Sequence, residues 1–347
     1  MFVRQRPPVL IAQQLTLPSG ELRGEPIEVG RVRVSETFGR YVMSAAPAGV
    51  VAYLGPADAI GQFTWMSREG RVLETVGAAD AQLGVELSPD GQRLATFRSD
   101  NIWTLDLARP VPSRVTRGQS RHPVWSPDGA RIATVYQGRG IGTFDLEVTS
   151  ATTGTFTTLV RGTFNNKPVG WTRDGKTLVF HQTVDKSTAR SIWMMPIDDP
   201  QKAAPYLQDG AKNIEARLSP DTNWIAYTTD RSGRFEVEVG SFPIPSARHP
   251  ISLEGGGYPR WRADGRELYF LSANSRMMAV AVTPGDPPVF SRPQPLFEVK
   301  LVAHPDRENF GAYEYDVNAD GSRFLLNRQV SEPVRNLTII VNWTPQQ

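Results

Sequence analysis

The chain has 347 residues, and its 38 Lys and Arg against 36 Asp and Glu give a formal net charge of +2. This near balance, with no basic run, argues against nucleic acid as a partner. The chain contains no cysteine, which excludes disulfide bonds, thiolate catalysis and cysteine-ligated zinc, and which suits an oxidising compartment of the cell envelope.

The N-terminal region shows no export signal or anchor. Residues 1–8 lack an apolar core of signal-peptide length, and no apolar run reaches membrane-spanning length. We therefore expect no membrane insertion by this chain, which is either a cytoplasmic protein or part of a larger protein with its membrane segment upstream. The second interpretation is favoured, because residues 1–30 read as outer strands without the turn that every later repeat carries. It predicts an extracytoplasmic or periplasmic location.

One four-residue turn recurs along the rest of the chain and predicts β-hairpins. In Ser126-Pro127-Asp128-Gly129, Ser can bond back to the backbone, Pro presets φ, Asp tolerates the third position and Gly adopts the left-handed conformation. Most copies follow an apolar residue or Trp and precede an alternating stretch typical of a strand. We expect a structural role for the turn residues, which are Asp90, Gly91, Asp128, Gly129, Asp174, Gly175, Asp221, Asp264, Gly265, Asp320 and Gly321.

The turns are spaced at the period of a repeat protein. Their third positions lie at residues 48, 90, 128, 174, 221, 264 and 320, the first being a degenerate copy without Asp. Intervals of 38 to 56 residues, with about four strand-like stretches each and no helical period, indicate a β-propeller of four-stranded antiparallel blades. Directly before three of the turns stand Trp125, Trp171 and Trp261, which we expect to pack between blades.

The last repeat is incomplete, and this predicts how the ring closes. It offers an inner hairpin at residues 313–328 and a third strand at 336–343, but no clear fourth strand. An N-terminal strand from the outer strands of residues 1–30, at 25–30 or 9–17, can complete this blade and cover its exposed edge. We therefore predict one all-β domain over residues 1–347, a propeller of seven blades, with six blades as the alternative.

The repeat resembles that of TolB-like propellers, whose core reads W-S-P-D-G-x-x-I-A. Residues 122–133, with Trp-Ser-Pro-Asp-Gly at their centre, match this core closely. The segments at 9–14, 24–29 and 339–343 are similar to pieces of the propeller at the C-terminal end of bacterial membrane-anchored Ser/Thr kinases. The resemblance implies the fold, whereas propellers of this kind serve as docking platforms, receptors and a few enzymes alike.

A ring of polar residues is predicted at one mouth of the central channel. Counting three residues back from the residue that precedes each turn reaches one position per blade, near the start of the inner strand. Flanking positions add two cations. An alternative interpretation is a solvated rim without a ligand. The predicted binding residues are His122, Lys167, Glu215, Tyr258, Arg260 and Glu314.

Two functions of different classes agree with these patterns. The first is a non-catalytic binding module, a monomer that holds a protein partner or an envelope-derived small ligand and has no catalytic residue, cofactor or metal. The absence of G-x-S-x-G, H-R-D and D-F-G motifs favours it. The alternative is a metal-assisted lyase or lactonase with its site in the central channel, where His122, Glu215 and Glu314 would be the ligands.

Overall fold

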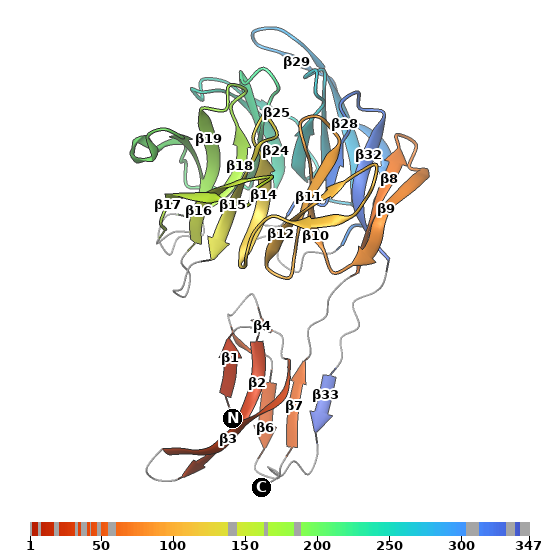
Figure 1. Ribbon diagram of the computed structural model, residues 1–347. Helices are drawn as coiled ribbons and strands as arrows, with labels where there is room; N and C mark the ends of the chain where they lie inside the picture. The colour runs from red at the N-terminus through yellow and green to blue at the C-terminus, as the bar shows by residue number, and fades with distance from the viewer. Residues whose placement is uncertain are drawn as a thin grey trace. The chain divides into compact units, whose positions relative to one another are not determined.

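The computed structural model describes residues 2–5, 8–16, 21–31, 34–35, 40–41, 43–46, 50–54, 60–137, 144–162, 166–183, 189–302, 312–330 and 337–340. The chain divides into two compact units, Met1–Ile60 with Ser331–Gln347 and Gly61–Val330, where the sequence predicts a single domain (Figure 1). Among the residues described, no helix has the length and apolar character that crossing a membrane requires.

The larger unit is a propeller of six antiparallel blades. The inner strands of neighbouring blades contact one another in turn, and the last contacts the first, so the ring is closed. Blades one to three are β10 (Leu83–Leu87), β11 (Arg93–Arg98), β12 (Asn101–Asp106) and β13 (Pro112–Arg114); β14 (Ser120–Trp125), β15 (Arg131–Gln137), β16 (Phe144–Ser150) and β17 (Phe156–Val160); and β18 (Asn166–Trp171), β19 (Thr177–Gln182), β20 (Ser191–Pro196) and β21 (Ala204–Leu207).

Blades four to six follow the same order, and blade five carries an extra strand. The second strand of blade four is buried at every position, as expected for a strand covered by neighbouring blades on both faces. These blades are β22 (Asn213–Leu218), β23 (Trp224–Thr229), β24 (Glu236–Ser241) and β25 (Arg248–Pro250); β26 (Gly256–Trp261), β27 (Glu267–Ser272), β28 (Arg276–Thr283) and β30 (Gln294–Glu298), with β29 (Val289–Phe290) also on β28; and β31 (Tyr315–Val317), β32 (Arg323–Gln329), β8 (Gly61–Ser67) and β9 (Val72–Asp80).

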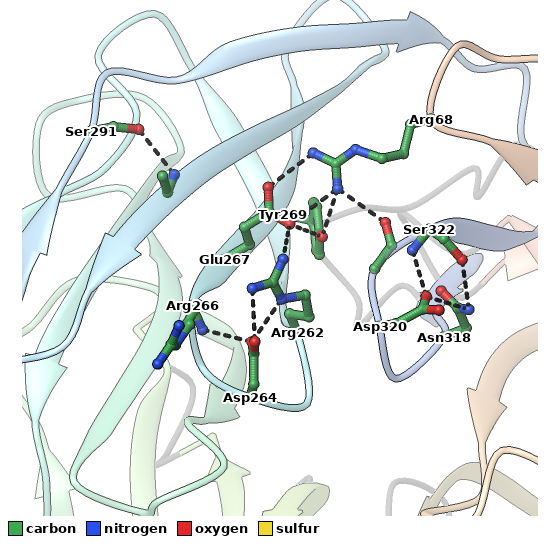
Figure 2. A network of polar contacts seen from close by, with 12 residues as sticks. Arg68, Arg262, Asp264, Arg266, Glu267, Tyr269, Ser291, Asn318, Asp320 and Ser322 are labelled. Atoms are coloured by element: carbon green, nitrogen blue, oxygen red, sulfur yellow. Dashed lines mark hydrogen bonds and ion pairs between the residues drawn. The ribbon is translucent and has the colours of Figure 1, made fainter.

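The sixth blade is completed by β8 and β9, not by residues 25–30 or 9–17 as predicted. Strand β8 pairs with β32 in the register Trp65 to Leu325, and both side chains are buried. In the hairpin between β8 and β9, Arg68 reaches blade five and donates two hydrogen bonds to the Glu267 carboxylate, at 2.9 and 3.0 Å (Figure 2). Arg68 also donates to the hydroxyl of Tyr269 and to the carbonyl of Gly321. The closing hairpin is thus pinned to its neighbour.

The smaller unit explains why the propeller has six blades and not seven. Strands β6 (Met43–Ala46) and β7 (Val50–Leu54) flank the degenerate turn at 47–49, which lies outside the described residues, and they pair with β33 (Leu337–Ile340). The predicted third strand of the last blade therefore joins this hairpin. The other strands of the unit are β1 (Phe2–Gln5), β2 (Pro8–Thr16), β3 (Glu21–Arg31), β4 (Val34–Ser35) and β5 (Arg40–Tyr41).

The six turns of the propeller share one set of hydrogen bonds around their aspartates. In the second blade, Ser126 Oγ donates to Asp128 Oδ1 at 2.5 Å, and the same oxygen accepts the Ala130 N–H at 3.0 Å. Gly129 adopts a φ of 65° and donates its N–H to the Ser126 carbonyl at 2.9 Å. The carboxylate therefore organises the turn itself, and these contacts lower the pKa of Asp128, the bond from Ser126 being the largest cause.

The tryptophans before the turns join neighbouring blades. Trp125 Nε1 donates to the Glu86 carbonyl of the preceding blade at 3.1 Å, and the Arg93 guanidinium lies 4.6 Å from the centroid of its ring. Such a bond contributes about 1 kcal/mol, and cation–π stacking contributes about 0.5–1 kcal/mol at exposed sites. The same bond recurs from Trp171 Nε1 to the Val124 carbonyl at 3.3 Å and from Trp261 Nε1 to the Arg217 carbonyl at 3.1 Å.

Candidate functional site

The inner strands carry a β-bulge at the positions that the sequence marks as the channel mouth. The pairing register shifts there in each of the first five blades. In four of them the bulge residue has a positive φ, which is uncommon for residues other than glycine. These residues are Gly84 (φ 85°), His122 (φ 55°), Glu215 (φ 55°) and Tyr258 (φ 59°).

Glu215 and Glu314 tie their own blades to the next blade around the ring. Glu215 is 2% exposed, and its Oε2 accepts both the Tyr258 N–H and the Thr228 hydroxyl at 2.8 Å. Glu314 is 4% exposed, and its two oxygens accept the Gly84 N–H at 3.1 Å and the Asn327 amide at 2.7 Å. Each carboxylate thus accepts a backbone N–H that the bulge leaves without a partner in the neighbouring strand. This role is structural.

Two residues beyond the mouth positions of blades one, four, five and six, four charged side chains meet inside the channel. Glu86 Oε2 accepts hydrogen bonds from Arg217 at 2.8 Å and from Arg260 at 2.7 Å. Arg260 also lies 3.6 Å from Asp316 Oδ1, and Asp316 Oδ2 accepts the Leu87 N–H at 2.9 Å. The four side chains are between 7% and 13% exposed. Two carboxylates and two guanidiniums therefore neutralise one another at the channel centre, a set that we call the channel ion cluster.

Tyr313 packs against both arginines of the channel ion cluster. Its ring centroid is 3.9 Å from the Arg217 guanidinium carbon and 4.2 Å from that of Arg260. Its hydroxyl donates to the Glu215 carbonyl at 2.5 Å. Desolvated cation–π contacts of this kind contribute about 2 kcal/mol. The aromatic ring therefore gives both guanidiniums a second contact besides the Glu86 carboxylate.

Burial and pairing set the protonation of these groups. Burial would raise the pKa of Glu86, but the charges of Arg217 and Arg260 together hold it below its ordinary value. Burial raises the pKa of Asp316, and the attraction of Arg260 offsets only part of this rise. Burial also lowers the pKa of Lys167 to about 7, against the opposing attraction of Glu215. The inner channel thus contains a lysine that is readily neutralised.

The six predicted binding residues divide by exposure. Lys167, Glu215, Arg260 and Glu314 are buried, whereas His122 and Tyr258 are partly exposed. His122 and Lys167 line one cavity of about 20 Å³, together with parts of the channel wall. This is room for about one water molecule. The sequence pattern did not identify Glu86, Arg217, Tyr313 and Asp316, although a count of two residues beyond each mouth position reaches three of them.

A larger hollow opens beside the mouth between blades five and six. It holds about 270 Å³ and is lined by Tyr258 and Glu314 together with apolar side chains such as Leu271 and Leu301. Within the part of the chain that the structure describes, no three His, Asp or Glu side chains form a group able to hold a metal ion. The mouth therefore offers aromatic and apolar contact surface.

Comparison with known proteins gives the fold. No protein-family model and no curated protein matches the sequence. Among solved structures, a putative TolB from Agrobacterium tumefaciens is similar with a TM-score of 0.65 and 20% identity, over 79% of this chain and 99% of that one. TolB from Acinetobacter baumannii is similar with a TM-score of 0.50 and 16% identity, over 82% of this chain and 78% of that one. Hydrazine synthase from Kuenenia stuttgartiensis is similar with a TM-score of 0.55 and 14% identity, over 86% of this chain and 94% of that one.

These likenesses confirm the predicted TolB-like propeller fold, and at such identities they show the fold alone. The resemblance to the propeller of membrane-anchored kinases stays a prediction.

Proposed function

We propose that this chain is a non-catalytic binding propeller that docks a protein partner on the mouth of its channel, as a module of a larger envelope or signalling protein. The observation that carries the proposal is the channel ion cluster. Its carboxylates and guanidiniums are nearly buried and paired with one another, so they hold the ring together. Catalytic groups would instead need to face a space that admits a substrate.

At this end of the channel, the surface accessible to a partner is the rim of the mouth. His122 and Tyr258 are partly exposed aromatic residues on blades two and five, and Tyr258 borders the hollow of about 270 Å³. Aromatic residues supply large contact areas at low entropic cost and are enriched in the centres of interfaces. A protein loop with an apolar side chain fits this hollow better than a small charged ligand does.

The test is affinity capture from an envelope extract with matched variants. His122→Asn with Tyr258→Asn removes both rings while keeping a residue that tolerates a positive φ. Val111→Ser, at a side chain 71% exposed on blade one, is the control. We expect one specific partner to be held by the wild type and the control and lost by the double variant. Retention by the double variant would contradict docking at the mouth, and a stoichiometric divalent ion without any partner would favour the lyase or lactonase alternative.

A further inference from the structure

The opposite ends of the inner strands, where the six turns lie, carry residues that break the repeat. At the second turn position five blades have Pro or Ala, whereas blade three has Arg173. At the fourth position five blades have Gly, whereas blade four has Thr222. The fold alone requires neither residue, because the other turns form the same hydrogen bonds without them.

Thr222 holds a conformation that strongly disfavours its side chain. Its φ is 64°, one degree below the range of 65° to 73° that the five equivalent glycines adopt. A β-branched residue in this region is a genuine outlier and costs about 1–2 kcal/mol. Its hydroxyl oxygen accepts the Arg173 N–H at 3.1 Å. The two unusual residues are therefore linked by a hydrogen bond, through which Thr222 stabilises the turn that carries Arg173.

A third deviation from the repeat, an insertion in blade five, lies close to Arg173. Blade five has an insertion between β28 and β30, whose residues Pro284 and Pro288 line a hollow of about 470 Å³ with Trp261. A second hollow of about 550 Å³ lies between blades three and four, against Phe242. Arg173 lines both hollows. One arginine thus lines two depressions whose walls both contain proline and aromatic side chains.

The other charged side chains that line the two hollows already have hydrogen-bond or ion-pair partners within the described residues. Asp174 and Asp221 accept hydrogen bonds within their own turns, and Asp264 is held by two bonds from Arg262 (Figure 2). Lys202 lies 3.0 Å from Asp199. The exposed side chain of Arg173 makes no hydrogen bond or ion pair with any residue in the described ranges. The complementary group is a carboxylate, which a guanidinium binds with two parallel hydrogen bonds.

We propose that this face docks an extended acidic segment of a partner protein, with an Asp or Glu on Arg173 and an apolar side chain in each hollow. In an extended segment, residues two before and two after the acid project to the same side as the acid. The expected pattern is apolar-x-acid-x-apolar. The site is independent of the mouth, because it lies at the other end of the inner strands.

The test uses a displayed library of random linear peptides selected on the whole chain. We expect enriched sequences with the predicted pattern, and a synthetic peptide that binds about tenfold to a hundredfold less tightly to Arg173→Ala or when its acid is replaced by the amide. Ala occupies the same position in two other turns, so this variant keeps the fold. Thr222→Gly should weaken binding by about threefold although it removes strain, so its thermal midpoint should not fall.

Three results would overturn the site. They are a selection that enriches no peptide, enriched peptides without an acid, and binding that Arg173→Ala leaves unchanged. The double variant of His122 and Tyr258 must still bind the peptide fully. Loss of binding in that variant would place the peptide at the mouth and refute this proposal. Loss of binding only in Arg173→Ala would support this site and would say nothing about docking at the mouth, which the affinity capture tests separately.

Discussion

Glu215 and Glu314 stand at equivalent positions in blades four and six and meet the same need. The bulge of the following blade leaves a backbone N–H outside the strand ladder, and the carboxylate accepts it. The second contact of each carboxylate, to Thr228 or to Asn327, comes from its own blade. Residues that look like ligands in the sequence thus act as links between blades.

Replacement of Glu215 tests this role. Glu215→Ala leaves the Tyr258 N–H and the Thr228 hydroxyl without their acceptor, and we expect the free energy of unfolding to fall by about 1–3 kcal/mol. Glu215→Gln keeps an oxygen acceptor and should lose less. Urea denaturation measures both, and equal stability of Glu215→Ala and the wild type would show that the link does not contribute.

Lys167 predicts a dependence of stability on pH. Its pKa is lowered by burial to about 7 in the folded chain, from an ordinary value of 10.5. Between about pH 7 and 10.5 the unfolded state therefore binds more protons, so this residue makes stability rise with pH across that window and change little below it. Lys167→Met should flatten the rise in the urea midpoint. Identical slopes for both proteins would show that the lysine titrates normally.

At the scale of elements, the hairpin of β8 and β9 closes the ring by two means. Its strand edge pairs with β32, and its tip places Arg68 in a bidentate contact with Glu267 (Figure 2). The Glu267 carboxylate also accepts bonds from Arg262 and Tyr269. Several donors converge on one partly buried carboxylate, so removal of one member leaves the others less well placed.

Arg68→Ala tests the closure. The side chain is 33% exposed, so solvent screens part of its contribution, and we expect a loss of about 1–2 kcal/mol. Cleavage by a protease within residues 61–80 should become faster, because the closing hairpin opens more often. Glu69→Ala is the control, since among the described residues the hydrogen bonds of Glu69 go only to Ser67, in its own turn, and none reaches blade five. Equal cleavage of the two variants would refute a closing role for Arg68.

At the scale of the whole molecule, local signals were predictable and distant pairings were not. The turns at Asp128 and its equivalents and the seat of Trp125 between blades follow from hydrogen bonding and shape within one repeat. The degenerate turn at residues 46–49 also predicts a hairpin, but a turn sets only local pairing and does not decide which sheet the hairpin joins. The seven-blade prediction was wrong for this reason, because β6 and β7 pair with β33.

The repeat register can point to the positions of the channel ion cluster, but it does not show that these side chains meet. Arg217 and Glu86 are 131 residues apart, and they meet only because the ring closes. In the sequence each looks like an ordinary surface charge of a strand. Their burial depends on the radius of the ring, and thus on the number of blades.

The most direct test of this account is the stability of Glu86→Gln, a change of charge at nearly constant shape. If the channel ion cluster holds the ring together, loss of the one carboxylate shared by Arg217 and Arg260 leaves two nearly buried cations poorly compensated, and the free energy of unfolding falls by about 3–5 kcal/mol. A variant as stable as the wild type, or more stable, would contradict the account. Such a result would indicate that the charges of the channel ion cluster serve binding or catalysis and cost the fold stability.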